Sequence, residues 1–246
     1  MLGSLEDRLT AEVNRRLIAS GQSVWCVSET DLFASTRFSL EIESTARSGL
    51  LQGTARTVSL DEITGVMFRF PRTWWPSLDF DLQDQLFVYH ETASSWFCLL
   101  SGLACPQINR FGLGWWVHDL SYPDQLRLGM AERLGMATIP AAPVPPHLVR
   151  VFPTPATEAE HARHVYVVGD RVLPRTSADH EVAMHLIRRS AALAQWERDT
   201  GIVLCRLDFR QQEALELAYV EPMPMLDGEA PDIVDEISEQ LARKLS

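Results

Sequence analysis

A cluster of prolines limits most strongly how this chain can fold. Six prolines fall within sixteen residues, at Pro140, Pro143, Pro145, Pro146, Pro153 and Pro155. Proline fixes φ and has no amide hydrogen, so this segment cannot form a continuous helix or a central strand. We therefore expect residues 140–156 to be a linker between an N-terminal domain, residues 1–139, and a C-terminal part, residues 157–246.

Alternating helices and strands are predicted before the prolines. Apolar spacing and stop signals predict helices over residues 4–20, 81–103 and 122–135, and short strands over residues 23–27, 37–42, 53–58, 65–70 and 105–109. A turn at Ser48-Gly49 would join the strands 37–42 and 53–58 into a hairpin. This order is typical of an α/β domain.

The C-terminal part predicts a sheet of mixed or antiparallel strands with helices. Gly169-Asp170 is a strong hairpin signal inside residues 164–172. A helix is expected over residues 178–200, strands over 202–209 and 214–220, and a final helix over 233–245.

Charge and cysteine usage exclude several partner classes. The chain has 22 basic and 33 acidic residues, a net charge of −11, whereas nucleic acids and anionic membranes attract clustered positive charge. The sequence has no apolar run long enough to span a bilayer, and the start lacks a secretory signal. Its four cysteines are scattered, as in reducing compartments, so we expect a cytoplasmic protein.

Lysine is almost absent. Lys244 is the only one, and the other 21 basic residues are arginines. Mechanisms that need a Schiff base, a phosphate-loop lysine or a lysine general base are therefore excluded for residues 1–243.

Two acidic residues stand near predicted strand ends. A hairpin of the strands 202–209 and 214–220 would bring Asp208 and Glu221 side by side, where they could hold a divalent metal. The alternative is a solvated sheet edge, because carboxylates at strand ends are common.

Two arginines follow the predicted strand 65–70. Arg69 and Arg72 lie where α/β proteins often bind ligands, and a guanidinium suits a carboxylate or a phosphate. The alternative is a salt bridge to a helix, for instance the one that carries Glu91.

Tandem tryptophans mark two loops. Trp74-Trp75 precede a proline and Trp115-Trp116 follow two glycines, so one ring of each pair could point outward to a peptide or partner. Ordinary packing beneath a loop is the alternative.

The order of these segments resembles the ATP-grasp enzymes, in particular the ATP-grasp maturases of ribosomally made peptides. The front half of the match is GVMFRFPRTWWP, a helix with Glu91, CPQIN ending in Asn109, and YPDQLRLGMAERLGMATIP. The back half is VYVVGDRVLPR, then IVLCRLDF and LAYVEPMP, which resemble the paired metal-binding strands of the family. The resemblance covers nearly the whole chain.

The resemblance implies roles for particular residues. Asp208 and Glu221 match the acidic metal ligands, but Met223 stands at the asparagine position. Tyr122 replaces one nucleotide lysine, the other has no counterpart, and the nucleotide contacts would fall on three residues, Arg163, His164 and Arg171. Arg69, Glu91 and Asn109 match retained positions of the front domain.

The resemblance also implies a missing lobe. Only residues 141–163 separate Pro140 from His164, too few for the central lid subdomain of the family. We therefore expect an α/β fold in which a pre-ATP-grasp-like domain precedes a reduced ATP-grasp C-terminal lobe, with the lid subdomain missing.

These losses predict a degenerate, non-catalytic protein with no cofactor. It would bind a peptide or protein partner in peptide maturation, for example an active biosynthetic enzyme, as a homo-oligomer or a hetero-complex, through Arg69, Arg72, Trp74, Trp75, Glu91, Asn109, Trp115 and Trp116. The alternative is an active ATP-dependent ligase that joins a carboxylate to an amine or thiol, with Mg²⁺ and ATP as cofactors. A third possibility is unrelated chemistry at His118-Asp119.

Overall fold

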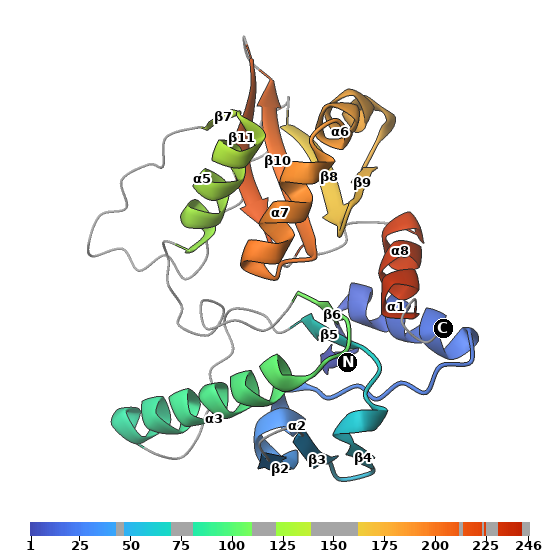
Figure 1. Cartoon of the computed structure of the whole chain (residues 1–246), viewed down its shortest axis with the longest axis vertical. Coiled ribbons are helices and arrows are strands. Elements are labelled where there is room, and N and C mark those ends of the chain that lie inside the picture. Colours follow the sequence, from blue (N-terminus) through green and yellow to red (C-terminus); the bar gives the residue numbers. More distant parts are fainter. Residues whose placement is uncertain are drawn as a thin grey trace. The chain divides into compact units, whose positions relative to one another are not determined.

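The computed structural model describes residues 1–42, 47–69, 81–109, 122–138, 162–211, 214–222, 224 and 231–242. The chain forms two compact units. The first contains Met1–Val117 and Ile237–Ser246, and the second contains His118–Glu236. Strands and helices alternate through much of both units, which confirms the predicted α/β class (Figure 1).

The units divide at a different place from the one that the prolines suggested. Helix α5 (Tyr122–Leu134) packs against strand β11 (Leu215–Glu221) of the second unit. Strand β7 (Ala137–Thr138) pairs in parallel with the same strand. Residues 122–138 therefore belong to the second unit, and the segment 140–156 lies outside the described residues.

The first unit is built on a short parallel sheet. Its strand order is β1 (Leu2–Gly3), β5 (Val66–Arg69) and β6 (Gln107–Ile108). Helices α1 (Arg8–Ala19) and α3 (Leu82–Gly102) follow β1 and β5 and confirm two predicted helices. Their buried side chains, with those of β5, form the apolar core of this unit, and they include Leu9, Val13, Met67, Phe68, Trp96 and Leu99.

The predicted strand 23–27 is wrong. Its only β-bridge is the isolated parallel bridge of Val27 to Leu2 in the two-residue strand β1. Directly afterwards Ser28 caps helix α2 (Glu29–Ala34), and its hydroxyl accepts a hydrogen bond from the amide of Asp31 at 3.1 Å. A cap of this kind ends the extended run.

The predicted hairpin exists, but its partner strand is different. Strand β2 (Arg37–Ile42) pairs with β3 (Arg47–Gln52), which pairs in turn with β4 (Thr57–Ser59). Gly49 is therefore a strand residue and not the expected turn residue. A Cβ at Gly49 would lie 2.2 Å from the carbonyl oxygen of Ser39, so close strand approach requires glycine here.

The second unit is built on a five-stranded sheet in the order β7, β11, β10 (Leu204–Gln211), β8 (Ala162–Val168) and β9 (Arg171–Pro174). Helices α5, α6 (His180–Ile187) and α7 (Ser190–Thr200) lie over one face of it (Figure 1). The predicted hairpin at Gly169-Asp170 is confirmed. The last helix, α8, spans Pro231–Ala242.

The helix expected over residues 178–200 is interrupted. It breaks at Arg188 and Arg189, between α6 and α7. The Nε of Arg189 donates a hydrogen bond to the carbonyl oxygen of Leu134 at 2.7 Å. This contact with α5 is long-range, so periodicity could not reveal it. Gly201, in the left-handed conformation at φ 70°, ends α7 as predicted.

Side-chain alternation gives the five-stranded sheet one apolar face. Cys205, Leu207, Val165 and Val167 are buried on this face. Each of them alternates with a residue of the opposite face, where several polar side chains gather. Among the described residues, no helix is both long and apolar enough to cross a membrane.

Gly49→Ala should destabilise the small sheet of the first unit. The new Cβ would meet the backbone of Ser39, so β2 and β3 must separate, at a cost of about 1–3 kcal/mol in the free energy of unfolding. Urea denaturation measures this cost. The control is Gly129→Ala in α5, where a Cβ meets only the end of Arg133 at 3.4 Å and stability should be unchanged or higher. Equal stability of the Gly49→Ala and wild-type proteins would contradict the close approach of Gly49 to the backbone of Ser39.

Candidate functional site

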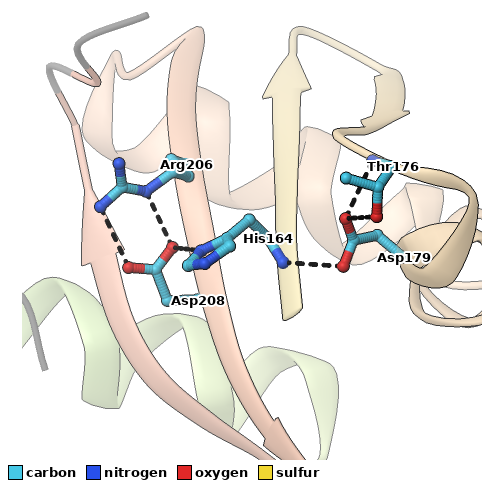
Figure 2. A network of polar contacts seen from close by, with 5 residues as sticks. All are labelled: His164, Thr176, Asp179, Arg206 and Asp208. Carbon is cyan, nitrogen blue, oxygen red and sulfur yellow. Dashed lines mark hydrogen bonds and ion pairs between the residues drawn. The ribbon is translucent and has the colours of Figure 1, made fainter. Parts of the chain in front are cut away.

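Polar side chains gather on the face of the second sheet that lies opposite its apolar face. Asp208 on β10 is registered with His164 on β8 and with Tyr219 on β11. Arg206, two residues earlier, is registered with Tyr166 and Glu221. Residues paired directly across antiparallel strands share a face. In Figure 2 the side chains of Arg206, Asp208 and His164 lie in front of the strands, and the pale green helix α5 lies behind them.

Asp208 is the centre of this cluster. The Nε of Arg206 donates to its Oδ1 at 2.8 Å, and a terminal nitrogen of the same guanidinium donates to its Oδ2 at 3.1 Å. The Nδ1 of His164 lies 2.8 Å from Oδ1 (Figure 2). Both carboxylate oxygens are thus in hydrogen bonds, and the side chain is only 8% exposed.

The guanidinium of Arg206 is held among negative and phenolic groups. Burial alone would lower its pKa, but Asp208, and then Tyr166 and Glu221, outweigh this effect and raise the pKa above its usual value. Its side chain is 12% exposed. Arg206 is therefore a fixed positive charge within the polar face.

Glu221 does not lie beside Asp208 as the sequence suggested. Asp208 occupies the middle of β10, and the register places Arg206, not Asp208, opposite Glu221. The Tyr219 hydroxyl donates to Glu221 at 3.2 Å. Asp208 and Glu221 share a face of the sheet. Arg206, however, lies opposite Glu221 and forms its ion pair with Asp208.

His164 is also fixed through its backbone. Its amide donates to Oδ1 of Asp179 at 3.1 Å, and the amide and hydroxyl of Thr176 bind Oδ2 of Asp179 at 2.9 and 2.7 Å (Figure 2). Asp179 is buried directly before α6. The buried carboxylate thus ties β8 to the beginning of α6.

The three residues expected to contact a nucleotide do not share one face. Arg163 is registered with Phe209, so strand alternation places it on the face opposite His164. Arg171 is registered with Val168 on the same face as His164, is exposed, and lies 3.5 Å from the carboxylate of Glu236. A nucleotide role for these residues stays a prediction.

In the first unit, Arg69 and Asn109 lie at the carboxyl edge of the parallel sheet. Arg69 ends β5 and Asn109 directly follows β6, and both are buried. Asn109 has φ 57°, a left-handed conformation that asparagine tolerates better than most residues. Glu91 is exposed on α3. The other predicted contact residues, Arg72, Trp74, Trp75, Trp115 and Trp116, lie outside the described residues.

Arg69 has a structural partner that the sequence did not suggest. Its Nε and a terminal nitrogen each donate to the Asp7 carboxylate at 2.9 Å. Asp7 also caps α1 by accepting from the amide of Thr10 at 2.9 Å. The pair therefore joins the end of β5 to the beginning of α1, and whether Arg69 also contacts a partner stays a prediction.

Sequence reasoning missed Arg206, Tyr166, Tyr219, Asp179 and Asp7 as members of these clusters. One available signal was the two-residue spacing of Arg206 and Asp208, which places both on one face of a strand. The positions of the tyrosines depend on strand register, which the sequence did not fix.

Several solved structures share this fold. MdnC, a macrocyclase from Microcystis aeruginosa MRC solved with precursor peptide MdnA, is 14% identical, with a TM-score of 0.68 over 99% of this chain and 100% of that chain. A RiPP-associated ATP-grasp ligase from Chryseobacterium gregarium, in complex with ADP and a leader and core peptide, is 12% identical, with a TM-score of 0.67 over 99% and 96%.

A third neighbour holds a metal. The ATP-grasp ligase PsnB, complexed with a phosphomimetic variant of its minimal precursor, Mg and ADP, is 14% identical, with a TM-score of 0.67 over 100% of this chain and 96% of that chain. No protein-family model and no curated protein matches the sequence.

These likenesses confirm that the chain has the ATP-grasp type of fold that its sequence resembles. The aligned spans cover both chains almost completely, so they do not confirm a missing lid subdomain, which stays a prediction.

The polar face, as arranged, does not suit Mg²⁺. Magnesium demands oxygen ligands in a nearly octahedral arrangement, whereas Arg206 and His164 use both oxygens of Asp208. Within the described ranges, no group of three or more histidines, cysteines and acidic residues could hold a metal ion. Met223 lies outside those ranges.

Arg206→Gln and Asp208→Asn should each destabilise the second unit. Each variant leaves a mostly buried charge without its ion-pair partner, which lowers the free energy of unfolding by about 3 kcal/mol. The double variant should lose less than the sum by about 2 kcal/mol, because neither member of this ion pair is then left charged opposite an uncharged partner. Urea denaturation of all four proteins measures this coupling.

A surface ion pair provides the control for this cycle. Arg133 and Asp199 are 2.6 Å apart with side chains 35% and 37% exposed, so Asp199→Asn should leave the unfolding midpoint unchanged. Additive losses at Arg206 and Asp208 would show that their ion pair contributes no coupling.

Asp7→Asn should remove a pH-dependent contribution to stability. Burial would raise the pKa of Asp7, but hydrogen bonds and the charge of Arg69, with bonds from Thr10, lower it overall. Ionised Asp7 therefore stabilises the fold above its unfolded pKa, about 3.9, and this contribution is lost as pH falls through the lower folded pKa.

We expect Asp7→Asn to lower the free energy of unfolding at pH 7 by about 2 kcal/mol, because Arg69 is buried. The difference from wild type should narrow below about pH 4. Glu12→Gln, in an exposed pair with Arg15, should have little effect at any pH. If the difference in unfolding free energy between Asp7→Asn and wild type stays constant down to acid pH, the pH-dependent contribution of Asp7 is contradicted.

Proposed function

We propose that this chain is an ATP-grasp-type protein that binds a precursor peptide in peptide maturation and does not itself carry out ATP-dependent ligation. The observation that carries the proposal is the set of cations: Lys244 is the only lysine, and Arg206 is committed to Asp208. Triphosphate chemistry depends on positioned cations. The near absence of lysine and the pairing of Arg206 with Asp208 both count against it.

Peptide binding is supported by the neighbours of the same fold. MdnC is bound with precursor peptide MdnA, and the Chryseobacterium ligase holds a leader and a core peptide. The peptide contacts that we propose are Arg69, Arg72, Trp74, Trp75, Glu91, Asn109, Trp115 and Trp116. Indole rings bury large apolar areas at low entropic cost and suit a peptide surface.

The assembly and compartment remain part of the proposal. The protein would act as a homo-oligomer or in a complex with an active biosynthetic enzyme, in the cytoplasm. A net charge of −11 argues that neither nucleic acid nor an anionic membrane is its partner.

One observation favours the alternative of an active ligase. Asp208 and Glu221 share a face of the sheet with Arg206, so a bound nucleotide could draw the guanidinium toward phosphate and release a carboxylate for Mg²⁺. In that case Mg²⁺ and ATP would be cofactors, and the chain would form an acyl phosphate from a peptide carboxylate.

Calorimetry and an ADP assay separate the two functions. We expect precursor peptides encoded next to the gene to bind with the same affinity with and without Mg-ATP, and no ADP to be released. Replacing Trp115 and Trp116 by alanine should weaken peptide binding about tenfold. Glu12→Gln, on an exposed face of α1, is the matched control and should bind as wild type does.

Two results would contradict the proposal. Peptide-dependent ADP release that Asp208→Ala abolishes would establish the ligase instead. Micromolar binding of Mg-ATP would show that the nucleotide site survives without lysine.

A further inference from the structure

The cation in the polar face is supplied by the chain itself. Asp208 accepts two hydrogen bonds from Arg206, on both of its oxygens, and one contact from His164. The strand register places Arg206 opposite Glu221 and beside Asp208, two residues along the same strand. A guanidinium is always protonated at ordinary pH, so its positive charge is permanent.

The backbone of Arg206 is held beside these carboxylates. It is part of a central strand, paired on one side with β8 and on the other with β11. Its side chain is 12% exposed, and the planar fork matches the carboxylate with two parallel bonds. A free metal ion must therefore compete with a tethered cation that is already desolvated.

We infer that Arg206 is a built-in cation that takes the place of a divalent metal between Asp208 and Glu221 and makes this face independent of metal. This inference rests on the proposed function, since it explains how the fold keeps its two strand carboxylates neutralised without magnesium. The raised pKa of Arg206, to which both carboxylates and Tyr166 contribute, is consistent with it.

Removal of the guanidinium should create a metal site. In Arg206→Gln the two carboxylates lose their cation, and hard oxygen ligands on one face suit Mn²⁺. We expect calorimetry or Mn²⁺ electron paramagnetic resonance to show saturable binding to Arg206→Gln, at least about tenfold tighter than to wild type. Asp208→Asn in the same background should abolish this binding, and Arg206→Lys, which keeps the charge, should not bind Mn²⁺.

A measurement on the wild-type chain covers the case in which Arg206→Gln does not fold. A ligand that binds only the folded state raises its melting temperature. MgCl₂ or MnCl₂ should therefore leave the melting temperature of wild type unchanged relative to NaCl of equal ionic strength. A rise that Asp208→Asn removes, or Mn²⁺ binding to wild type as tight as to Arg206→Gln, would overturn the inference.

These experiments use neither nucleotide nor peptide, so their outcome is distinct from that of the proposed function. Metal binding to wild type would overturn the role of Arg206 and leave peptide binding intact. Failure to bind any precursor peptide would overturn the proposed function, and the metal measurements would still decide what Arg206 does.

Discussion

The ion pair of Arg206 with Asp208 governs what the polar face of the five-stranded sheet can do. Both residues belong to one strand, so the pair forms with little loss of chain entropy and the sheet holds it in place. Burial of one charge without the other would be costly. The register that places Tyr166, Glu221, His164 and Tyr219 around this pair therefore also sets the electrostatics of the whole face.

Both units use the same chemistry at their polar positions. Arg69 binds Asp7 through two nitrogens in the first unit, as Arg206 binds Asp208 in the second. A planar guanidinium can donate both bonds in a fixed geometry, and the ammonium of lysine cannot. The composition of 21 arginines and one lysine thus suits a chain in which Arg69 and Arg206 are structural partners of its own carboxylates.

Local signals predicted much of the fold. The helices near residues 8–19, 82–102 and 122–134 and the hairpin at Gly169-Asp170 follow from apolar spacing and turn chemistry, which act over a few residues. The errors arose where distant contacts decide. Gly49 looks like a turn residue in the sequence, yet it lies in a strand close to the carbonyl of Ser39. Arg189, at the break between α6 and α7, binds the carbonyl of Leu134 in α5.

The candidate site was predicted only in part, for the same reason. Asp208 and Glu221 were recognised as carboxylates of neighbouring strands, and they do share a face. Their offset, and the position of Arg206 opposite Glu221, depend on the strand register and on the bulge between Asp208 and Phe209. Register depends on which side chains are buried and on the geometry of the turn, and the bulge shifts it in a way that apolar spacing alone did not reveal. The partners of Arg69 and His164 are likewise long-range, as the bonds to Asp7 and Asp179 show.

The membership of β7 in the five-stranded sheet gives the proline-rich segment a different place in the chain from that of a domain linker. Residues 139–161 leave β7, at one edge of that sheet, and return to β8, which lies between β10 and β9. They are thus an internal connection of a single unit. A protease that cut there would release no domain, because the pairing of β7 with β11 and the packing of α5 on α7 would still hold the two pieces together.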